Sequence, residues 1–367
     1  MGQIFRRVLA FALLLAGLQA AVAEPCRIAY DLGSSGIRVG ASNRPGSAQT
    51  DIDFLSPLWA GHGLDQVIQP TIKALNELPT QADLPGDCIR VAAGFSAWRL
   101  ALQQDRQALV RHLRTLWQQT GTAIIVAPQV VEGRYGYTGA KLALGDRLKT
   151  THILDIGGGS LQLASADKSF GLALGQKAWH RLLCQTLRPG TKLPCTLLPM
   201  TPDELSQARA MAAKQFAGLP ATLGKVGSIT AISRPVTRGV VPAMEKLLLP
   251  PQGEELLSSS QLTRVLTLLA ASKPEDAARQ LGIAPKYVAY LISDAVLLES
   301  ILRSADVQQF AAMEGDQSNI PALLHDEQAF AWAAAYPCYL GHLQHIGLGA
   351  YGLSPQGCLK KRRRPFP

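Results

Sequence analysis

One short pattern of apolar and polar residues occurs twice in the chain. An apolar run ends in Asp31, a Gly/Ser turn follows, and the segment Ile37–Val39 then alternates between apolar and polar positions. The same order returns 124 residues later, with an apolar run that reaches Asp155, a turn of three glycines and a serine, and the alternating segment Leu161–Leu163. Each copy predicts a strand, a tight turn and a second strand. Two copies of one unit predict two similar α/β lobes that face each other.

The pattern outside the repeats predicts further elements. Strands are expected at Ile28–Tyr30, Ile89–Ala93 and Ala123–Val126, and helices at Leu64–Leu78, Ala97–Gln119, Leu205–Phe216, Ser258–Ala271 and Ala284–Arg303. Thr201, Pro202 and Glu204 supply an N-cap, a proline at the first helical position and an acidic residue at the third, which marks a helix start. The Gly- and Pro-rich segment Pro235–Gly253 is predicted to be a loop.

The periodicity weakens after about Asp306, and this sets the expected division of the chain. We expect a first lobe at residues 24–140, a second lobe at 141–305 and a mostly irregular C-terminal extension at 306–367. The extension ends in the basic tail Lys360–Arg364, which is expected to be solvated and disordered.

The first residues have the layout of a secretory signal peptide. Arg6-Arg7 precedes the apolar run Val8–Leu18, and Ala21 to Ala23 form a small-x-small cleavage site. The alternative is an uncleaved membrane anchor, but the 16 residues from Val8 to Ala23 are few for a bilayer core. We therefore expect residues 1–23 to be removed, the protein to be exported to the periplasm, and no stable membrane insertion.

Composition and charge exclude several classes of protein. The chain has 367 residues, 47% hydrophobic and 17% charged, which suits two cores and argues against intrinsic disorder. The formal net charge is +9, but seven cations lie in Arg6-Arg7 and Lys360–Arg364, and the remainder carries +2. A basic nucleic-acid-binding face is therefore not supported, and we expect no nucleic-acid partner.

Six cysteines follow the leader: Cys26, Cys88, Cys184, Cys195, Cys338 and Cys358. An even number in an exported chain indicates disulfides. Cys26 and Cys88 each precede a short apolar strand, so their sulfurs would meet at one sheet edge if the strands are parallel neighbours. We expect the pairs Cys26–Cys88, Cys184–Cys195 and Cys338–Cys358, with some buried free thiols as the alternative.

The two turns after Asp31 and Asp155 have a chemical use. Glycines let backbone N–H groups approach an anion, and a serine hydroxyl adds a donor. An aspartate at the strand end can hold Mg²⁺. A Rossmann loop would be followed by a helix, whereas Leu161–Leu163 has the alternation of a strand. A P-loop would need Gly-Lys-Ser/Thr, which neither turn contains.

These motifs resemble those of a known family. Ile28–Ser35 and Leu154–Ser160 resemble the two phosphate motifs of the actin/Hsp70/sugar-kinase fold, and within it the exopolyphosphatase and guanosine pentaphosphate phosphohydrolase (Ppx/GppA) family. Gln129–Arg134 resembles the family's Glu-Glu-Ala-Arg segment, Leu172–Gly175 its Met-Gly turn, and Leu281–Leu302 the closing helix of its second domain. The resemblance covers roughly residues 27–303 and implies two actin-like (ribonuclease H-like) lobes with a cleft between them.

The resemblance also implies an activity and a site. The activity is removal of terminal phosphate from polyphosphate or a guanosine pentaphosphate-like substrate, with Mg²⁺ or another divalent cation. The implied site residues are Glu132 as catalytic base; Gly33, Ser34, Ser35, Arg99, Gly157, Gly158, Gly159 and Ser160 for phosphate; and Asp31, Asp155 and Gln162 for the metal. Export favours polyphosphate, because alarmones are cytoplasmic. The sequence leaves open whether the protein forms a homodimer.

Two departures from the family pattern favour an alternative function. Gln162 stands where the family commonly has a metal-linked Glu, and the turn Val226–Thr230 has lost a glycine of the family's third turn. The alternative is a catalytically weakened member that binds polyanions or a protein partner. A kinase of the same fold is a third, weaker interpretation. His342 and His345 have a spacing that can bind metal, although a surface or packing pair is the ordinary interpretation.

Overall fold

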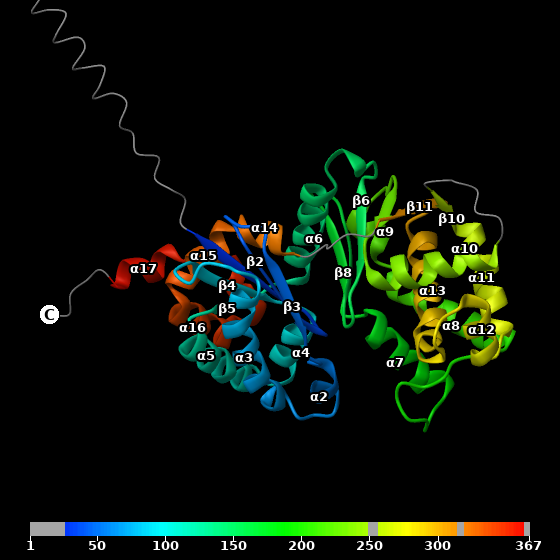
Figure 1. The fold of residues 1–367 in the computed structure, drawn as a ribbon, viewed down its shortest axis with the longest axis horizontal. Helices are drawn as coiled ribbons and strands as arrows, with labels where there is room; N and C mark the ends of the chain where they lie inside the picture. The colour runs from blue at the N-terminus through cyan, green and yellow to red at the C-terminus, as the bar shows by residue number, and fades with distance from the viewer. Residues whose placement is uncertain (1–25, 249–255, 314–318, 363–367) are drawn as a thin grey trace, which may run out of the picture.

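The repeat in the sequence becomes two sheets with the same strand connections (Figure 1). The computed structural model describes residues 26–248, 256–313 and 319–362. The first sheet has the order β3-β2-β1-β4-β5, with β1 Arg27–Leu32, β2 Gly36–Ala41, β3 Ser47–Asp51, β4 Ile89–Gly94 and β5 Ala123–Val126. The second has the order β8-β7-β6-β9-β11-β10, with β6 His152–Ile156, β7 Leu161–Ala164, β8 Ser169–Leu172, β9 Ile229–Ala231, β10 Leu257–Ser258 and β11 Gln309–Ala312.

Each sheet begins with three antiparallel strands and continues with two parallel ones. The antiparallel strands are β1 to β3 in the first sheet and β6 to β8 in the second. Strands β4 and β5 then continue parallel to β1, as β9 and β11 continue parallel to β6. The predicted pair of α/β lobes is therefore confirmed, and β10 adds one antiparallel strand to the second sheet.

Helices surround both sheets. Those of the first lobe are α2 Leu55–Trp59, α3 Asp65–Gln81, α4 Ser96–Gln104, α5 Arg106–Thr120, α14 Ile320–Leu324, α15 Glu327–Ala334, α16 Tyr336–Ile346 and α17 Gln356–Arg362. Those of the second are α7 Gln176–Leu187, α8 Pro202–Phe216, α9 Leu219–Leu223, α10 Val241–Leu247, α11 Ser259–Ala271, α12 Pro274–Leu281 and α13 Pro285–Ser304. Helix α6, Gln129–Leu144, lies between the lobes in Figure 1. Short 3₁₀ helices cover Gly145–Arg147 and Gly347–Gly352, and a π-helix covers Pro235–Val240.

Helix starts follow the expected capping chemistry. Thr201 accepts from the backbone N–H of Glu204, and the Glu204 carboxylate accepts from the N–H of Thr201, which confirms the predicted capping box. The single helix predicted over Ala97–Gln119 is instead two helices. Asp105 is extended, with φ −148° and ψ 95°, and its side chain caps α5 by accepting from the Ala108 N–H.

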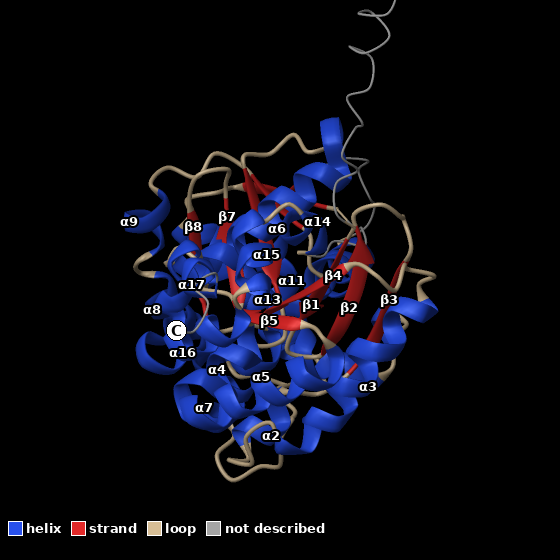
Figure 2. Cartoon of the chain, turned by 90° about the vertical axis from the view of Figure 1, so that its left-hand side faces the viewer, coloured by secondary structure: helices blue, strands red, loops and turns tan. Residues whose placement is uncertain are grey.

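The C-terminal part corrects a prediction. The residues after 306 were expected to be mostly irregular, but β11 completes the second sheet and α14 to α17 follow it. Buried aromatic side chains, among them Trp332, Tyr336 and Tyr339, belong to the same core as β1, β4 and β5. In Figure 2, which faces the first lobe, α15, α16 and α17 lie over this lobe. Apolar burial rather than a strong helical period determines this structure, and the boundaries at 140 and 305 stay predictions.

A second correction concerns the segment predicted as a loop at Pro235–Gly253. Residues 235–247 are helical, and Pro235 and Pro242 occupy first-turn positions where proline is tolerated. Val236, Val240 and Met244 form a buried face at helical spacing. Residues 249–253 lie outside the described part of the chain.

Three disulfides join the six cysteines, as predicted. They are Cys26–Cys88, Cys184–Cys195 and Cys338–Cys358. Cys26 and Cys88 directly precede β1 and β4, which are parallel neighbours. His180 Nε2 lies 3.3 Å from Cys184 Sγ, and His342 Nε2 lies 3.7 Å from Cys338 Sγ, so both histidines pack beside a disulfide.

Two predictions fall on residues outside the described part. The signal peptide at 1–23 is one, and the end of the basic tail, Arg363 and Arg364, is the other. The rest of the tail, up to Arg362, continues α17 and was wrongly expected to be disordered. Among the described helices, none is both long and apolar enough to cross a membrane.

Candidate functional site

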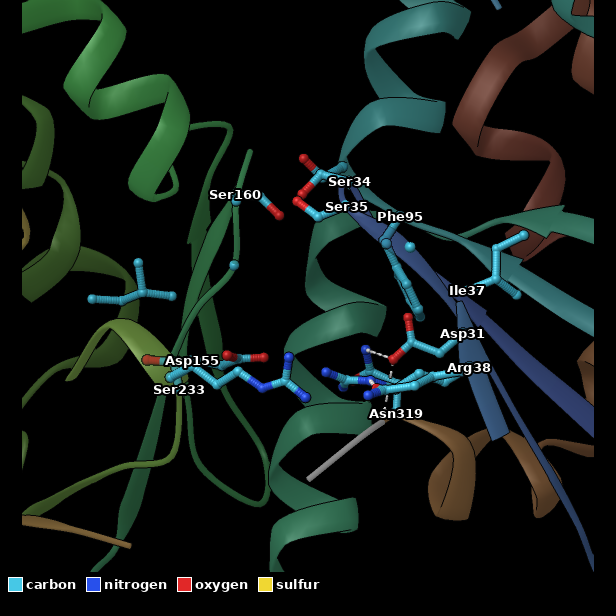
Figure 3. A pocket seen from close by; sticks show the side chains of 18 of the residues that line it. Asp31, Ser34, Ser35, Ile37, Arg38, Phe95, Asp155, Ser160, Ser233 and Asn319 are labelled. Carbon is cyan, nitrogen blue, oxygen red and sulfur yellow. Dashed lines mark hydrogen bonds between the residues drawn. The ribbon is translucent and has the colours of Figure 1, made fainter. Parts of the chain in front are cut away.

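A cavity of about 590 Å³ lies between the two lobes. Both predicted phosphate turns line it, together with Glu132 from α6 and the residues that follow β4 and β9. In Figure 3, Ser34 and Ser35 face Ser160, while Asp31, Arg38 and Asn319 lie together on the wall across from Asp155. The cleft implied by the family resemblance is thus present, and it joins the two copies of the repeat.

The two turns have the same hydrogen-bonding pattern. The N–H of Gly33 donates to Gly36 O at 3.0 Å, and the N–H of Gly157 donates to Ser160 O at 2.9 Å. The turns approach each other so closely that a Cβ on Gly158 would lie 2.6 Å from Ser34 Oγ. A side chain at this position would therefore force the Ser34 hydroxyl to move, which shows how closely the two lobes approach each other here.

Helix α7 fixes the second turn from behind. The N–H groups of Gln176 and Lys177 donate to the carbonyl oxygens of Gly157 and Gly158, each at 2.8 Å. A Cβ on Gly175 would lie 2.2 Å from Gly157 O, so the chain can enter the helix here only with a glycine. The first N–H groups of α7 are thus used to hold the turn, and the turn's own backbone remains the surface that faces the cavity.

Glu132 sits in a buried ion pair. Arg99, from α4, donates through Nη2 to Glu132 Oε2 at 2.6 Å and to Ser160 Oγ at 3.2 Å, and through Nη1 to Ala127 O at 3.1 Å. Burial raises the pKa of Glu132, and the Arg99 charge opposes this shift. Arg99 therefore orients the carboxylate and links it to Ser160 in the second turn.

Three carboxylates share one region of the cavity. Burial raises the pKa of Asp31, against the Arg38 charge and two hydrogen bonds from Asn319. Desolvation, with the negative charges of Glu132 and Asp31, raises the pKa of Asp155 to about 7. A hard divalent cation binds carboxylate oxygens and would neutralise the charges that repel one another here. Asp31 and Asp155 are therefore suited to the predicted cation.

Gln162 lies directly beside this region. It pairs with Asp155 across β6 and β7, as Arg38 pairs with Asp31 across β1 and β2. Its side chain is buried, and Nε2 donates to Ser160 Oγ at 3.2 Å. The repeat thus places a neutral amide and a cation at equivalent positions beside the two aspartates.

Most predicted site residues line the cavity. These are Asp31, Gly33, Ser34, Ser35, Glu132, Asp155, Gly157, Gly158 and Ser160. Arg99, Gly159 and Gln162 are not among the lining residues: Arg99 and Gln162 contact Ser160 from behind, and a Cβ on Gly159 would lie 2.3 Å from Ser96 Oγ. Direct phosphate contact by these three stays a prediction.

The segment that resembles the family's third turn does not line the main cavity. Val226–Thr230 runs into the start of β9, and Gly227 lines a separate cavity of about 410 Å³. The end of β9 that reaches the cleft continues instead into Ser233–Arg238, where Arg234 and Arg238 line the main cavity. The β9 core is only three residues long, so the sequence pattern did not show where the strand begins.

Sequence reasoning also missed other lining residues. Among them are the four cationic side chains of Arg38, Lys177, Arg234 and Arg238, and the amide of Asn319. Arg38 had a usable signal, because the 124-residue offset of the repeat relates it to Gln162. Asn319 had none, since it follows β11 and reaches Asp31 only through the fold.

The buried carboxyl of Asp294 leads to a prediction about pH. Gln176 Nε2 donates to Asp294 Oδ2, and burial raises the pKa of Asp294 from 3.8 to about 8. A pKa that is higher in the folded chain gives a stabilising contribution at low pH, which is lost as the pH rises from about 4 to 8. The Asp294→Asn variant lacks this dependence. Its melting temperature relative to wild type should therefore increase between pH 5 and pH 8, and an unchanged difference in thermal unfolding would contradict the assignment.

Comparison with known proteins identifies the fold. No protein-family model matches the chain, and no curated protein matches it in sequence. The crystal structure of the Aquifex aeolicus member of the Ppx/GppA family is similar, with a TM-score of 0.60 and 15% identity over 82% of this chain and 96% of that chain. An exopolyphosphatase from Cytophaga hutchinsonii gives a TM-score of 0.57 and 13% identity over 82% of this chain and 97% of that one. The chain thus has the two-lobed, actin-like fold of the Ppx/GppA structures, as its motifs predicted.

Proposed function

We propose that this protein is a phosphoanhydride hydrolase that removes terminal phosphate from inorganic polyphosphate, or from a guanosine pentaphosphate-like substrate. The observation that carries the proposal is the convergence of both phosphate turns and Glu132 on one cavity. The similar structures support it, because they include those of a Ppx/GppA phosphatase and an exopolyphosphatase.

The chain's own residues suit hydrolysis. Backbone N–H groups and the Ser34, Ser35 and Ser160 hydroxyls are of the type that binds phosphoryl oxygens. Glu132, with a raised pKa and an orientation fixed by Arg99, can accept a proton from an attacking water. A divalent cation held by Asp31 and Asp155, beside Gln162, would neutralise charge on the phosphate.

The cavity favours inorganic polyphosphate over a guanine nucleotide. Its lining includes four cationic side chains, from Arg38, Lys177, Arg234 and Arg238. A base would need a stacking surface, yet the one aromatic lining residue in the described part is Phe95, which is 1% exposed and packs edge-on against Tyr135. The proposed export of the chain favours the same substrate.

The neutral side chain of Gln162 is the reason to consider the alternative function, a catalytically weakened protein that binds polyanions. The Gln162→Glu variant tests it, because a carboxylate binds a divalent cation more strongly than a neutral amide. An active wild type should keep or increase its rate of phosphate release in this variant, measured at limiting Mg²⁺. The exposed Gln118→Glu on α5 is the matched control and should change nothing.

The two functions differ in one outcome. A wild type that binds polyphosphate without releasing phosphate, and gains release in Gln162→Glu, would identify a weakened enzyme. If Gln118→Glu also increased phosphate release, the effect of Gln162→Glu could not be attributed to the cation site.

A further inference from the structure

After β11 of the second sheet, the chain continues to α14 on the first lobe, where Asn319 lines the cavity. Strand β11 ends at Ala312, and the next described segment begins with Asn319 at the start of α14. Helix α14 packs on β1, β2 and α6, the elements that carry Asp31, Arg38 and Glu132. The C-terminal segment is thus part of the wall of the cavity, which Asn319 lines.

Asn319 makes two hydrogen bonds to one carboxylate oxygen. Its backbone N–H and its Nδ2 each donate to Asp31 Oδ2 at 3.2 Å, as the dashed lines in Figure 3 show. Both residues are buried, with exposed fractions of 8% for Asn319 and 9% for Asp31. Hydrogen bonds that favour the charged form of a buried carboxylate offset part of its desolvation cost.

Close packing holds Asn319 at this position. The next residue, Ile320, is 7% exposed, and a Cβ on Gly40 would lie 2.9 Å from Ile320 Cγ2. Gly40 belongs to β2, the strand that pairs with β1 and places Arg38 opposite Asp31. Asn319 therefore approaches Asp31 from a fixed element rather than from an exposed loop.

We infer that Asn319 is a positioning residue: it fixes Asp31 through Oδ2 and leaves Oδ1 to the divalent cation. An oxygen that accepts two hydrogen bonds has both lone pairs engaged, so the second oxygen is the one suited to a metal. The inference rests on the proposed function for the identity of the ligand. It adds that the C-terminal segment contributes to the cation site.

The test measures Mn²⁺ binding to the full chain by electron paramagnetic resonance, with phosphate release as a second readout. Asn319→Ala keeps the backbone donor and loses the side-chain donor, so its Mn²⁺ affinity should fall about tenfold, the scale of one hydrogen bond to a charged group. Asn319→Ser offers a shorter donor and should recover part of this loss. Asn76→Ala, at an exposed position of α3, is the matched control and should bind like wild type.

The kinetics separate positioning from general damage. In Asn319→Ala, the Mg²⁺ concentration for half-maximal phosphate release should rise, whereas kcat at saturating Mg²⁺ should stay close to wild type. Wild-type Mn²⁺ affinity in Asn319→Ala, or in Asn319→Ser if the alanine variant does not fold, would overturn the inference while the proposed function stands. A wild-type chain that neither binds Mn²⁺ nor releases phosphate would overturn both.

Discussion

Replacing Glu132 by glutamine is expected to lower the rate of phosphate release by about a hundredfold or more, the usual contribution of a general base. Glutamine keeps the shape of the side chain and can still accept a hydrogen bond from Arg99, but it cannot take a proton from water. Substrate binding should persist, because Arg99 can keep its hydrogen bond to Ser160 and the backbone of the two turns is unchanged. Steady-state kinetics and polyphosphate binding by the same variant measure the two effects separately.

The matched control for this variant is Glu77→Gln, at an exposed position of α3. It should leave both kcat and KM unchanged. If Glu132→Gln instead retained wild-type kcat, Glu132 would be a structural partner of Arg99 and the assignment of the base would be wrong. A loss of binding together with kcat would point to a collapsed cavity rather than to missing proton transfer.

Replacing Arg99 by methionine is expected to destabilise the fold by about 3–5 kcal/mol, because it leaves the buried Glu132 carboxylate without its charge partner. The variant also lacks the hydrogen bonds of Arg99 to Ala127 O and Ser160 Oγ, which connect α4 to the start of α6 and to the second turn. Phosphate release should fall as well, since the base is no longer oriented. Chemical denaturation at pH 7 gives the change in the free energy of unfolding.

The double variant Arg99→Met with Glu132→Gln checks the reason for this loss. Removing the uncompensated charge should restore a large part of the stability, without restoring activity. If the double variant is as unstable as Arg99→Met alone, packing around Arg99 and not the ion pair carries the effect. Arg114→Met, on the outer part of α5, is an exposed arginine for comparison.

The parts of the fold that could be predicted are those set by local pattern. The strand-turn-strand repeat around Asp31 and Asp155 is readable because alternation and glycine turns act over a few residues. The Cys26–Cys88 pair followed from two strands whose positions were already predicted. The site residues on the two turns and on α6 came from family motifs, and the fold brings most of them to one cavity.

The parts that could not be predicted depend on contacts between distant segments. Asn319 lies 288 residues from Asp31 in the chain, and only the return of the C-terminal segment brings them together. The helices α14 to α17 form because aromatic residues such as Tyr336 and Tyr339 find a core on the first lobe. Arg99 could be placed at the site by motif, whereas its pairing with Glu132 needed the arrangement of α4 and α6.

Hydrolysis by this protein is tested most directly by measuring the release of inorganic phosphate from long-chain polyphosphate by the wild type with Mg²⁺, before and after chelation. We expect steady release that stops when the cation is removed, returns when it is added back, and is nearly absent in Glu132→Gln. A folded wild-type protein that releases no phosphate with Mg²⁺, Mn²⁺ or Co²⁺, and gains none in Gln162→Glu, would contradict it.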